Sequence, residues 1–157
     1  MYYYFLPKKT RDDINCYCIN RYFCIKIYNM ERKVIAIAAF FGMTAVILGA
    51  FGAHKLKDLL NPQQLAAFET GVRYQMYHTF LLLFIGLNIG ISEKTRKAML
   101  WLIVLGITFF SGSIYLLTTI DMNHLNPKIL GPVTPVGGLL LIVAWFLLFV
   151  DFMKKKS

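Results

Sequence analysis

Four long stretches without a charged residue dominate the pattern of hydrophobic and polar positions along this chain. They cover residues 34–53, 74–92, 98–120 and 131–150. Each contains roughly the 17–25 residues that an α-helix needs to cross the hydrocarbon core of a bilayer. Helices are favoured there because a lipid-exposed backbone must satisfy its hydrogen bonds within the segment. The pattern predicts an all-α, polytopic membrane protein, a four-transmembrane-helix bundle.

Composition agrees with a membrane location and argues against a nucleic-acid partner. Of the 157 residues, 57% are hydrophobic and 16% are charged, whereas soluble domains carry about 25% charged residues. The net charge of +9 comes from short clusters of Lys and Arg between the apolar stretches. A nucleic-acid interface needs basic residues along a solvated surface. We therefore expect membrane lipid, and no nucleic acid, among the partners.

The distribution of basic residues predicts the orientation of the chain. In the four-span arrangement, one side receives 13 of the Lys and Arg residues and the other side receives 4. The smaller set is Lys55, Lys57, Arg73 and Lys128. Because cytoplasmic loops carry the excess of Lys and Arg, both the N-terminus and the C-terminus are predicted to be cytoplasmic.

The first 29 residues differ from the rest of the chain. They have no helical periodicity and no apolar run of the length that a secretory signal requires. We interpret residues 1–29 as a non-native or disordered extension, with the true start at Met30 and the four-span domain over residues 30–157. A translated, disordered basic extension is the alternative. Cys16, Cys18 and Cys24 match neither a disulfide framework nor a usual metal-ligand spacing, so no metal site is predicted.

One helix start is marked by the sequence Asn61-Pro62-Gln63-Gln64. An asparagine N-cap, a proline at the first helical position and a glutamine at the third form a capping-box pattern. The helix is therefore predicted to begin near Pro62 and to continue into the second span.

Small residues recur in the apolar stretches at positions that suit close helix packing. In lipid, such residues let helix backbones approach closely. We predict a helix-packing role for eight of them. They are Ala45, Gly49, Ala53, Gly86, Gly90, Gly112, Gly137 and Gly138. A tight bundle is the simpler interpretation, and a flexing hinge for transport is the other.

Polar residues at or inside the spans form a second candidate group. An ionisable residue at membrane depth is costly and is therefore a functional candidate. The predicted polar cluster lies near the outer face. It consists of His54, Glu69, Arg73, Tyr74, Gln75, His78, Ser111 and Ser113. The alternative is that Arg73 pairs with Glu69 or a lipid phosphate, while His78 forms a hydrogen bond within the bundle.

Several signatures are absent from the sequence. No Asp or Glu lies inside a span, which disfavours a proton-coupled cation exporter. The chain has no phosphate-binding loop, zinc-binding HExxH helix, dinucleotide fingerprint or nucleophile elbow. We therefore expect no cofactor and assign no catalytic residue.

Four segments, in order, resemble the motifs of the YgdD-like family of small bacterial membrane proteins, a domain of unknown function with distant eukaryotic relatives. They read GAFGAHKL (residues 49–56), VRYQMYH (72–78), FFSGSIYLL (109–117) and LGPVTPVGG (130–138). The resemblance covers residues 31 to about 150. It implies a four-span protein of the bacterial cytoplasmic (inner) membrane, and it supplies no activity or substrate. The family motifs fall on Gly49, Phe51, Gly52, His54, Arg73, Tyr74, Gln75, His78, Ser111, Gly112, Ser113, Pro135 and Gly137.

Three classes of function are compatible with the sequence. The first, which we favour, is an accessory, interaction or lipid-associated four-helix protein without enzymatic activity. It would bind membrane lipid, another membrane protein or further copies of itself. The alternative is a small oligomeric transporter or channel that uses the His and Arg residues of the polar cluster. An enzyme with His78 or His54 as acid–base is the weakest, because the residue has no predicted carboxylate or metal partner.

Overall fold

Helices make up all regular secondary structure in the part of the chain that the computed structural model describes. That part is residues 21–88, 90–119 and 130–154, with side chains described from Met30 onward. The long helices are α1 (Arg21–His54), α2 (Pro62–Leu87), α3 (Glu93–Thr118) and α6 (Val133–Lys154). A short 3-10 helix, η2 (Leu56–Asp58), follows α1. For the described residues, the predicted all-α class is confirmed.

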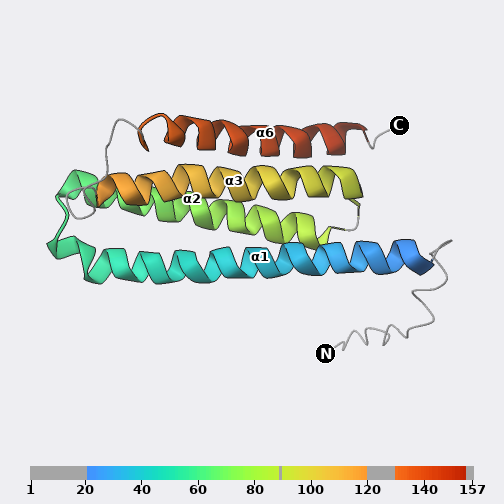
Figure 1. Cartoon of the computed structure of the whole chain (residues 1–157), viewed down its shortest axis with the longest axis horizontal. Coiled ribbons are helices and arrows are strands. Elements are labelled where there is room, and N and C mark those ends of the chain that lie inside the picture. The colour runs from blue at the N-terminus through green and yellow to red at the C-terminus, as the bar shows by residue number, and fades with distance from the viewer. Residues whose placement is uncertain (1–20, 89, 120–129, 155–157) are drawn as a thin grey trace, which may run out of the picture.

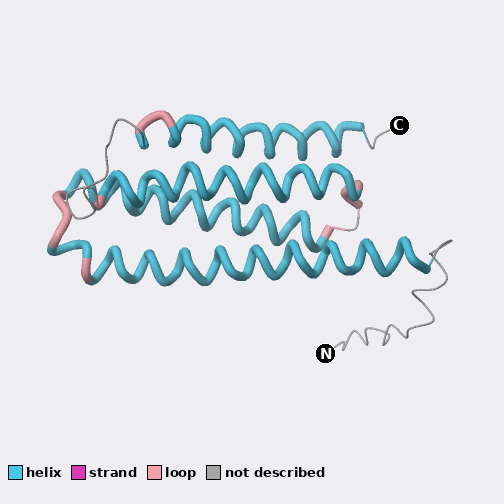
Figure 2. The backbone as a smooth tube through the Cα atoms, in the orientation of Figure 1, coloured by secondary structure: helices cyan, strands magenta, loops and turns pink. Residues whose placement is uncertain are grey.

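The four long helices lie side by side, with α2 and α3 between α1 and α6 (Figure 1). Helix α1 packs against α2, α2 against α3, and α3 against α6. Short loops join α1 to α2 and α2 to α3, so consecutive helices run in opposite directions (Figure 2). The start of α1 and the end of α6 therefore lie at the same end of the bundle, which we call the Glu31 end. The other end, where α1 stops and α2 starts, is the His54 end.

Three of the four long helices are apolar enough to cross a membrane. The first is Met30–Asp58, which comprises the described part of α1 and the short helix η2. The other two are α3 (Glu93–Thr118) and α6 (Val133–Lys154). Helix α2 does not meet this criterion, because its first half carries charged and polar side chains. It also ends at Leu87, five residues before the end of the predicted second span. Among the described residues, four long helices are therefore present, and three of them have the composition of a span.

Helix α1 begins earlier than the apolar pattern predicts. Its first residue is Arg21, so residues 21–29 continue the same helix on the N-terminal side of Met30. A helix satisfies its own backbone hydrogen bonds whether or not its side chains are apolar, and an apolar run therefore marks only part of it. Residues 1–20, including Cys16 and Cys18, lie outside the described residues.

The start of α2 has the predicted capping box. The Asn61 side chain accepts a hydrogen bond from the Gln64 backbone N–H at 2.9 Å, and the Gln64 side chain accepts one from the Asn61 N–H at 3.0 Å. Pro62 occupies the first helical turn. Since these two bonds satisfy backbone donors that a helix start leaves unpaired, they determine where the helix begins.

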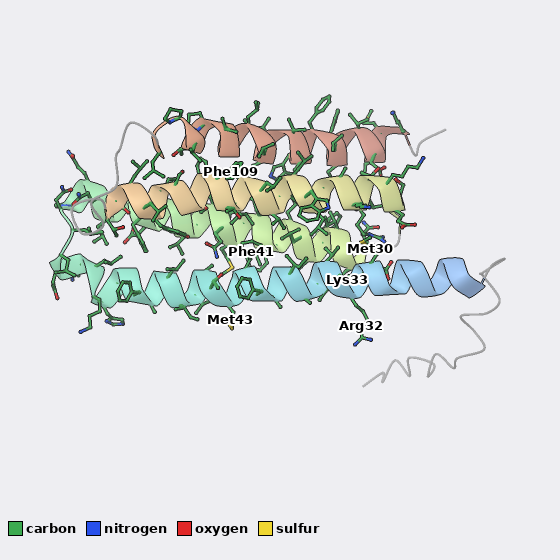
Figure 3. The ribbon with its side chains drawn as sticks, viewed as in Figure 1. Met30, Arg32, Lys33, Phe41, Met43 and Phe109 are labelled. Carbon is green, nitrogen blue, oxygen red and sulfur yellow. The ribbon has the colours of Figure 1, made fainter. Side chains whose placement is uncertain are left out.

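The core is a single apolar cluster to which all four long helices contribute. Its least exposed members include Val34 and Ala38 from α1, Leu82 from α2, Ile103 from α3 and Ala144 from α6. The opposite surface of α1 faces away from the bundle, where Arg32 and Met43 point outward (Figure 3). Met43 is 54% exposed, as expected for a side chain that meets lipid rather than protein.

Glycines allow close contacts between neighbouring helices at some of the predicted packing positions. A Cβ on Gly137 would lie 2.8 Å from the Phe109 carbonyl carbon and from the Phe110 Cα, both backbone atoms of α3. A Cβ on Gly86 would lie 2.9 Å from the Ile35 side chain of α1. At these two points the absence of a side chain lets the helices approach.

Three other predicted packing positions do not lie at a close contact between described helices. A Cβ on Gly112 would have no atom of the described residues within 4 Å, so this glycine makes no close contact with another described helix. Gly90 belongs to the turn after α2 and not to a helix, and its N–H donates to the Asn88 side chain. Ala53 is exposed. A spacing of four residues indicates a shared face, but it does not say whether that face meets another helix.

Candidate functional site

The polar residues predicted to form one cluster occupy several places. His54, Glu69 and Arg73 are exposed and lie towards the His54 end. Glu69 and Arg73 line a hollow of 220 Å³, together with Gly49, Gly52, Phe68 and Val72. We call this space the α1–α2 hollow. His54 is not among its lining residues.

Tyr74 and His78 lie on another side of α2 and contact each other. Their rings stack with centroids 6.2 Å apart, and His78 Nδ1 lies 2.7 Å from the Tyr74 carbonyl oxygen. Trp145 of α6 donates its Nε1–H to His78 Nε2 at 3.2 Å. Because an indole N–H can only donate, Nε2 is the acceptor and Nδ1 carries the proton. His78 is therefore a neutral imidazole with both nitrogens hydrogen-bonded.

A groove of 520 Å³ lies beside this histidine, between α2 and α6. We call it the α2–α6 groove. Its lining residues are Tyr74, Tyr77, His78, Phe110, Gly138, Leu141, Ile142 and Trp145. Tyr77 and Trp145 also line a second space of 290 Å³, which continues along both helices to Phe84 and Leu148. The volume of the first space lies within the roughly 300–1,000 Å³ that small-molecule sites occupy.

Gln75 forms a buried hydrogen-bond network that joins three helices. Its side-chain NH₂ group donates to the Phe41 carbonyl oxygen at 2.9 Å and to Thr44 Oγ1 at 2.8 Å, both in α1. Its Oε1 accepts from the Tyr115 hydroxyl of α3 at 2.9 Å. Since an amide has two donors and one acceptor oxygen, this side chain is well satisfied. Thr44 was not among the predicted site residues, and only the tertiary contact identifies it.

Ser111 and Ser113 of α3 differ in their contacts. Ser113 Oγ donates to the Phe110 carbonyl oxygen at 3.0 Å and lies 2.7 Å from Thr134 Oγ1 of α6. Ser111 is fully buried, and its hydroxyl has no hydrogen-bond partner among the described residues. Ser113 thus links α3 to α6, and Ser111 does not share that contact.

A buried arginine at the Glu31 end was not predicted as a site residue. Arg96 is 1% exposed and donates to the carbonyl oxygens of Ile85 at 3.0 Å, Asn88 at 2.8 Å and Ile91 at 3.4 Å. Its Nη1 lies 3.3 Å from Glu31 Oε1. Two of these acceptors, Ile85 and Asn88, belong to the C-terminal end of α2. A cation there satisfies carbonyls that a helix end leaves unpaired.

The residue before this arginine makes the contact to the fourth helix. Thr95 Oγ1 donates to Asp151 Oδ1 of α6 at 2.9 Å, so two consecutive side chains of α3 hold α1, α2 and α6. We call Glu31, Thr95, Arg96 and Asp151 the Arg96 clasp. The sequence contains one signal for it: Arg96 precedes the buried positions Met99, Ile103 and Ile107 at helical spacing.

No described group of three or more His, Cys, Asp and Glu side chains is close enough to hold a metal ion. The side chain of Cys24 and all atoms of Cys16 and Cys18 are outside the described residues. Among the described side chains, the structure offers hydrogen bonds between helices, the ion pair between buried Arg96 and Glu31, and apolar spaces that face outward.

Comparison with known proteins agrees with the resemblance seen in the motifs. Residues 48–138 match the family described as protein of unknown function (DUF423). A UPF0382 membrane protein of Staphylococcus epidermidis is 41% identical over 123 residues, which is 78% of this chain and 97% of that protein. YwdK, a UPF0382 membrane protein of Bacillus subtilis, is 37% identical over 78% of this chain and 98% of its own length.

The UPF0382 inner membrane protein YgdD of Escherichia coli is 34% identical over 129 residues, covering 80% of this chain and 93% of that protein. The predicted membership in a YgdD-like family is therefore confirmed. No solved structure gives a significant match to the chain. With a family match over more than half of its length and relatives of this similarity, the chain belongs to the DUF423 family of proteins of unknown function.

Proposed function

We propose that this chain is a lipid-associated, non-enzymatic membrane protein that holds an apolar chain of a membrane lipid in the α2–α6 groove. The observation that carries the proposal is the groove itself, an aromatic-lined space on an apolar surface. The exposed side chains beside it include Phe80, Ile142 and Phe146, at 59%, 65% and 62% exposure. In a bilayer such a surface is covered by lipid chains, so a lipid is the ligand with direct access.

The buried polar side chains support binding and assembly over catalysis. Gln75 uses its amide to connect α1, α2 and α3, and His78 uses both ring nitrogens. A general acid or base needs a nitrogen within reach of a substrate. Because the hydrogen bonds of His78 stay within the protein, its simplest role is to join α2 to α6.

The alternative of a transporter or channel receives less support. Such a path needs polar groups lined up across the bundle. Arg73 and Glu69 line the α1–α2 hollow, whereas Tyr74 and His78 line the α2–α6 groove. The polar cluster is thus divided between two surfaces of α2, and these residues do not surround a common cavity.

We also propose an orientation of the bundle in the membrane. The start of α1 and the end of α6 share the Glu31 end, which carries Arg32, Lys33, Lys94, Lys97 and Lys154. By the positive-inside rule this end faces the cytoplasm, with four helices crossing the bacterial cytoplasmic membrane.

Reporter fusions test this orientation. A fusion after Ser92 and one after Lys155 are expected to report the cytoplasm, and a fusion after Asn61 is expected to report the outside. The physical reason is the excess of basic residues at the Glu31 end. A cytoplasmic signal at Asn61 would mean that α1 does not cross, and the four-span proposal would then be abandoned.

Filling the groove tests the lipid proposal. A Cβ on Gly138 would make an ordinary contact of 3.5 Å with the Phe110 ring, so a larger side chain would extend into the groove. Gly138→Phe is expected to lose most of the co-purifying lipid, measured by native mass spectrometry of protein extracted in mild detergent. Gly112→Phe is the matched control, because this glycine has open space beside it. Equal lipid retention in both variants would contradict the proposal.

A further inference from the structure

We propose that the α1–α2 hollow is a headgroup site for an anionic phospholipid, with Arg73 holding the phosphate. This site is distinct from the α2–α6 groove. The hollow lies between α1 and α2, whereas the groove lies between α2 and α6. Three features of this place favour a phosphate headgroup: the shape of the hollow, the guanidinium of Arg73, which forms no ion pair with a described carboxylate, and the depth of this arginine in the bundle.

The hollow exists because α1 presents glycines to α2 at this level. Gly49 and Gly52 leave the space open, and a Cβ on Gly52 would already come within 3.2 Å of the Phe68 ring. The space of 220 Å³ is lined by these glycines, by apolar atoms of Phe68 and Val72, and by the side chain of Arg73. Any larger residue on α1 would occupy it.

Arg73 brings to the hollow a positive charge that forms no ion pair with a described carboxylate. Its Nη2 donates to Thr70 Oγ1 at 3.2 Å. Although Glu69 is one helical turn away, no described carboxylate forms an ion pair with Arg73. A guanidinium has five N–H donors in a planar fork that matches phosphate. Most of its donors are therefore available to an external anion.

The depth of Arg73 places it where lipid phosphates lie. Gly71, half a turn earlier in α2, meets Ile114 and Tyr115 of α3. The distance along α3 from Arg96 to Ile114 is about 27 Å at 1.5 Å per residue, and Arg73, two residues nearer the Arg96 clasp than Gly71, is at about 24 Å. A long arginine side chain can reach from there towards the far boundary of a hydrocarbon core of roughly 30 Å. With the Arg96 clasp at one boundary, Arg73 lies near the other.

The surface next to the hollow favours a lipid over a free phosphate ion. Tyr77 and Phe80 follow Arg73 on α2 at intervals of four and three residues, and both are exposed, at 56% and 59%. Acyl chains attached to a phosphate at Arg73 would run along this apolar stripe. Tyr77 also lines the α2–α6 groove, so the headgroup position, and not the path of the acyl chains, is what separates the two sites. Glu69 shares the hollow, and its negative charge opposes the phosphate and limits the affinity.

The test measures lipid preference of the full chain in detergent by native mass spectrometry. Phosphatidylglycerol and phosphatidylcholine with the same acyl chains are the two probes. We expect the wild type to bind phosphatidylglycerol about tenfold more tightly, a difference of about 1.4 kcal/mol. Arg73→Gln is expected to abolish the preference, Arg73→Lys to retain part of it, and Glu69→Gln to increase it.

Lys57→Gln is the matched control, because it removes one exposed positive charge at the same end without touching the hollow. If Lys57→Gln lowers the preference as much as Arg73→Gln, the effect is general electrostatics and the proposed site is wrong. Full competition by millimolar inorganic phosphate would also overturn it in favour of a free-ion site. Because Arg73 is exposed, all variants should keep the helical circular dichroism of the wild type. The Gly138→Phe variant should keep its headgroup preference, so failure of the groove and failure of this site are distinguishable.

Discussion

Replacing Arg96 by leucine is expected to destabilise the helix bundle by about 3 kcal/mol, the lower end of the range found when one partner of a buried ion pair is removed, because the Glu31 side chain is 19% exposed. The substitution leaves the carbonyl oxygens of Ile85, Asn88 and Ile91 without their donor, and it leaves the Glu31 carboxylate without its cation. Buried polar groups without partners are costly because neither water nor protein satisfies them. The measurement is reversible unfolding in mixed micelles with an increasing fraction of SDS, with circular dichroism as the signal.

Two further variants separate the buried charge from a general effect of losing a basic residue. Lys97→Leu removes an exposed cation next to Arg96, and its expected effect is within about 0.5 kcal/mol. The double variant Glu31→Leu with Arg96→Leu is expected to recover part of the loss, because no unpaired carboxylate remains. Recovery is incomplete, since the three carbonyl oxygens still lack a donor. Wild-type stability of Arg96→Leu would refute the clasp.

Adding one methyl group at Gly137 is expected to separate α6 from α3. The alanine Cβ would lie 2.8 Å from the Phe109 carbonyl carbon and the Phe110 Cα. These are backbone atoms, so no side chain can rotate away and the helices themselves must move apart. Overpacking of this kind costs about 1–3 kcal/mol. The loss is important in lipid, because close packing is a main force that holds helices together there. Thermal unfolding of purified Gly137→Ala in detergent measures the effect.

The neighbouring glycine supplies the control. A Cβ on Gly138 would approach the Phe110 ring no closer than 3.5 Å, which is ordinary van der Waals contact. Gly138→Ala is therefore expected to unfold at the temperature of the wild type or somewhat above it, because alanine has a higher helix propensity than glycine. The two substitutions add the same methyl group at adjacent positions of one helix and have the same effect on helix propensity. If both variants are equally stable, the close approach of α6 to α3 is not present in solution.

Local sequence patterns were sufficient for much of the fold. The apolar stretches identified the long helices, because a segment in lipid must satisfy its backbone internally. The capping box at Asn61 and Gln64 marked the start of α2, since both hydrogen bonds join residues three positions apart. The motifs in residues 49–138 indicated the family that the comparisons then confirmed.

The candidate site depended more strongly on tertiary contacts. The sequence placed Arg73, Gln75 and His78 within one short segment, and the structure directs them to three different surroundings. At 3.6 residues per turn, adjacent positions point in different directions. A run of polar residues on a helix therefore predicts several contacts and not one site. The partners Thr44 and Trp145 are 31 and 67 residues away from Gln75 and His78, beyond the reach of any local pattern.

The sequence by itself determined the helical class, the position of the apolar stretches, the capped start of α2 and the family. All of these follow from interactions within a few residues or from total apolar length. Only the tertiary structure decided which cation is buried in the basic segment Lys94–Lys97, and which glycine lies against another backbone. Lys94, Arg96 and Lys97 carry the same charge, and positions 112, 137 and 138 are all glycine. What distinguishes them is the rotation of each helix about its axis, which is set when the whole core packs.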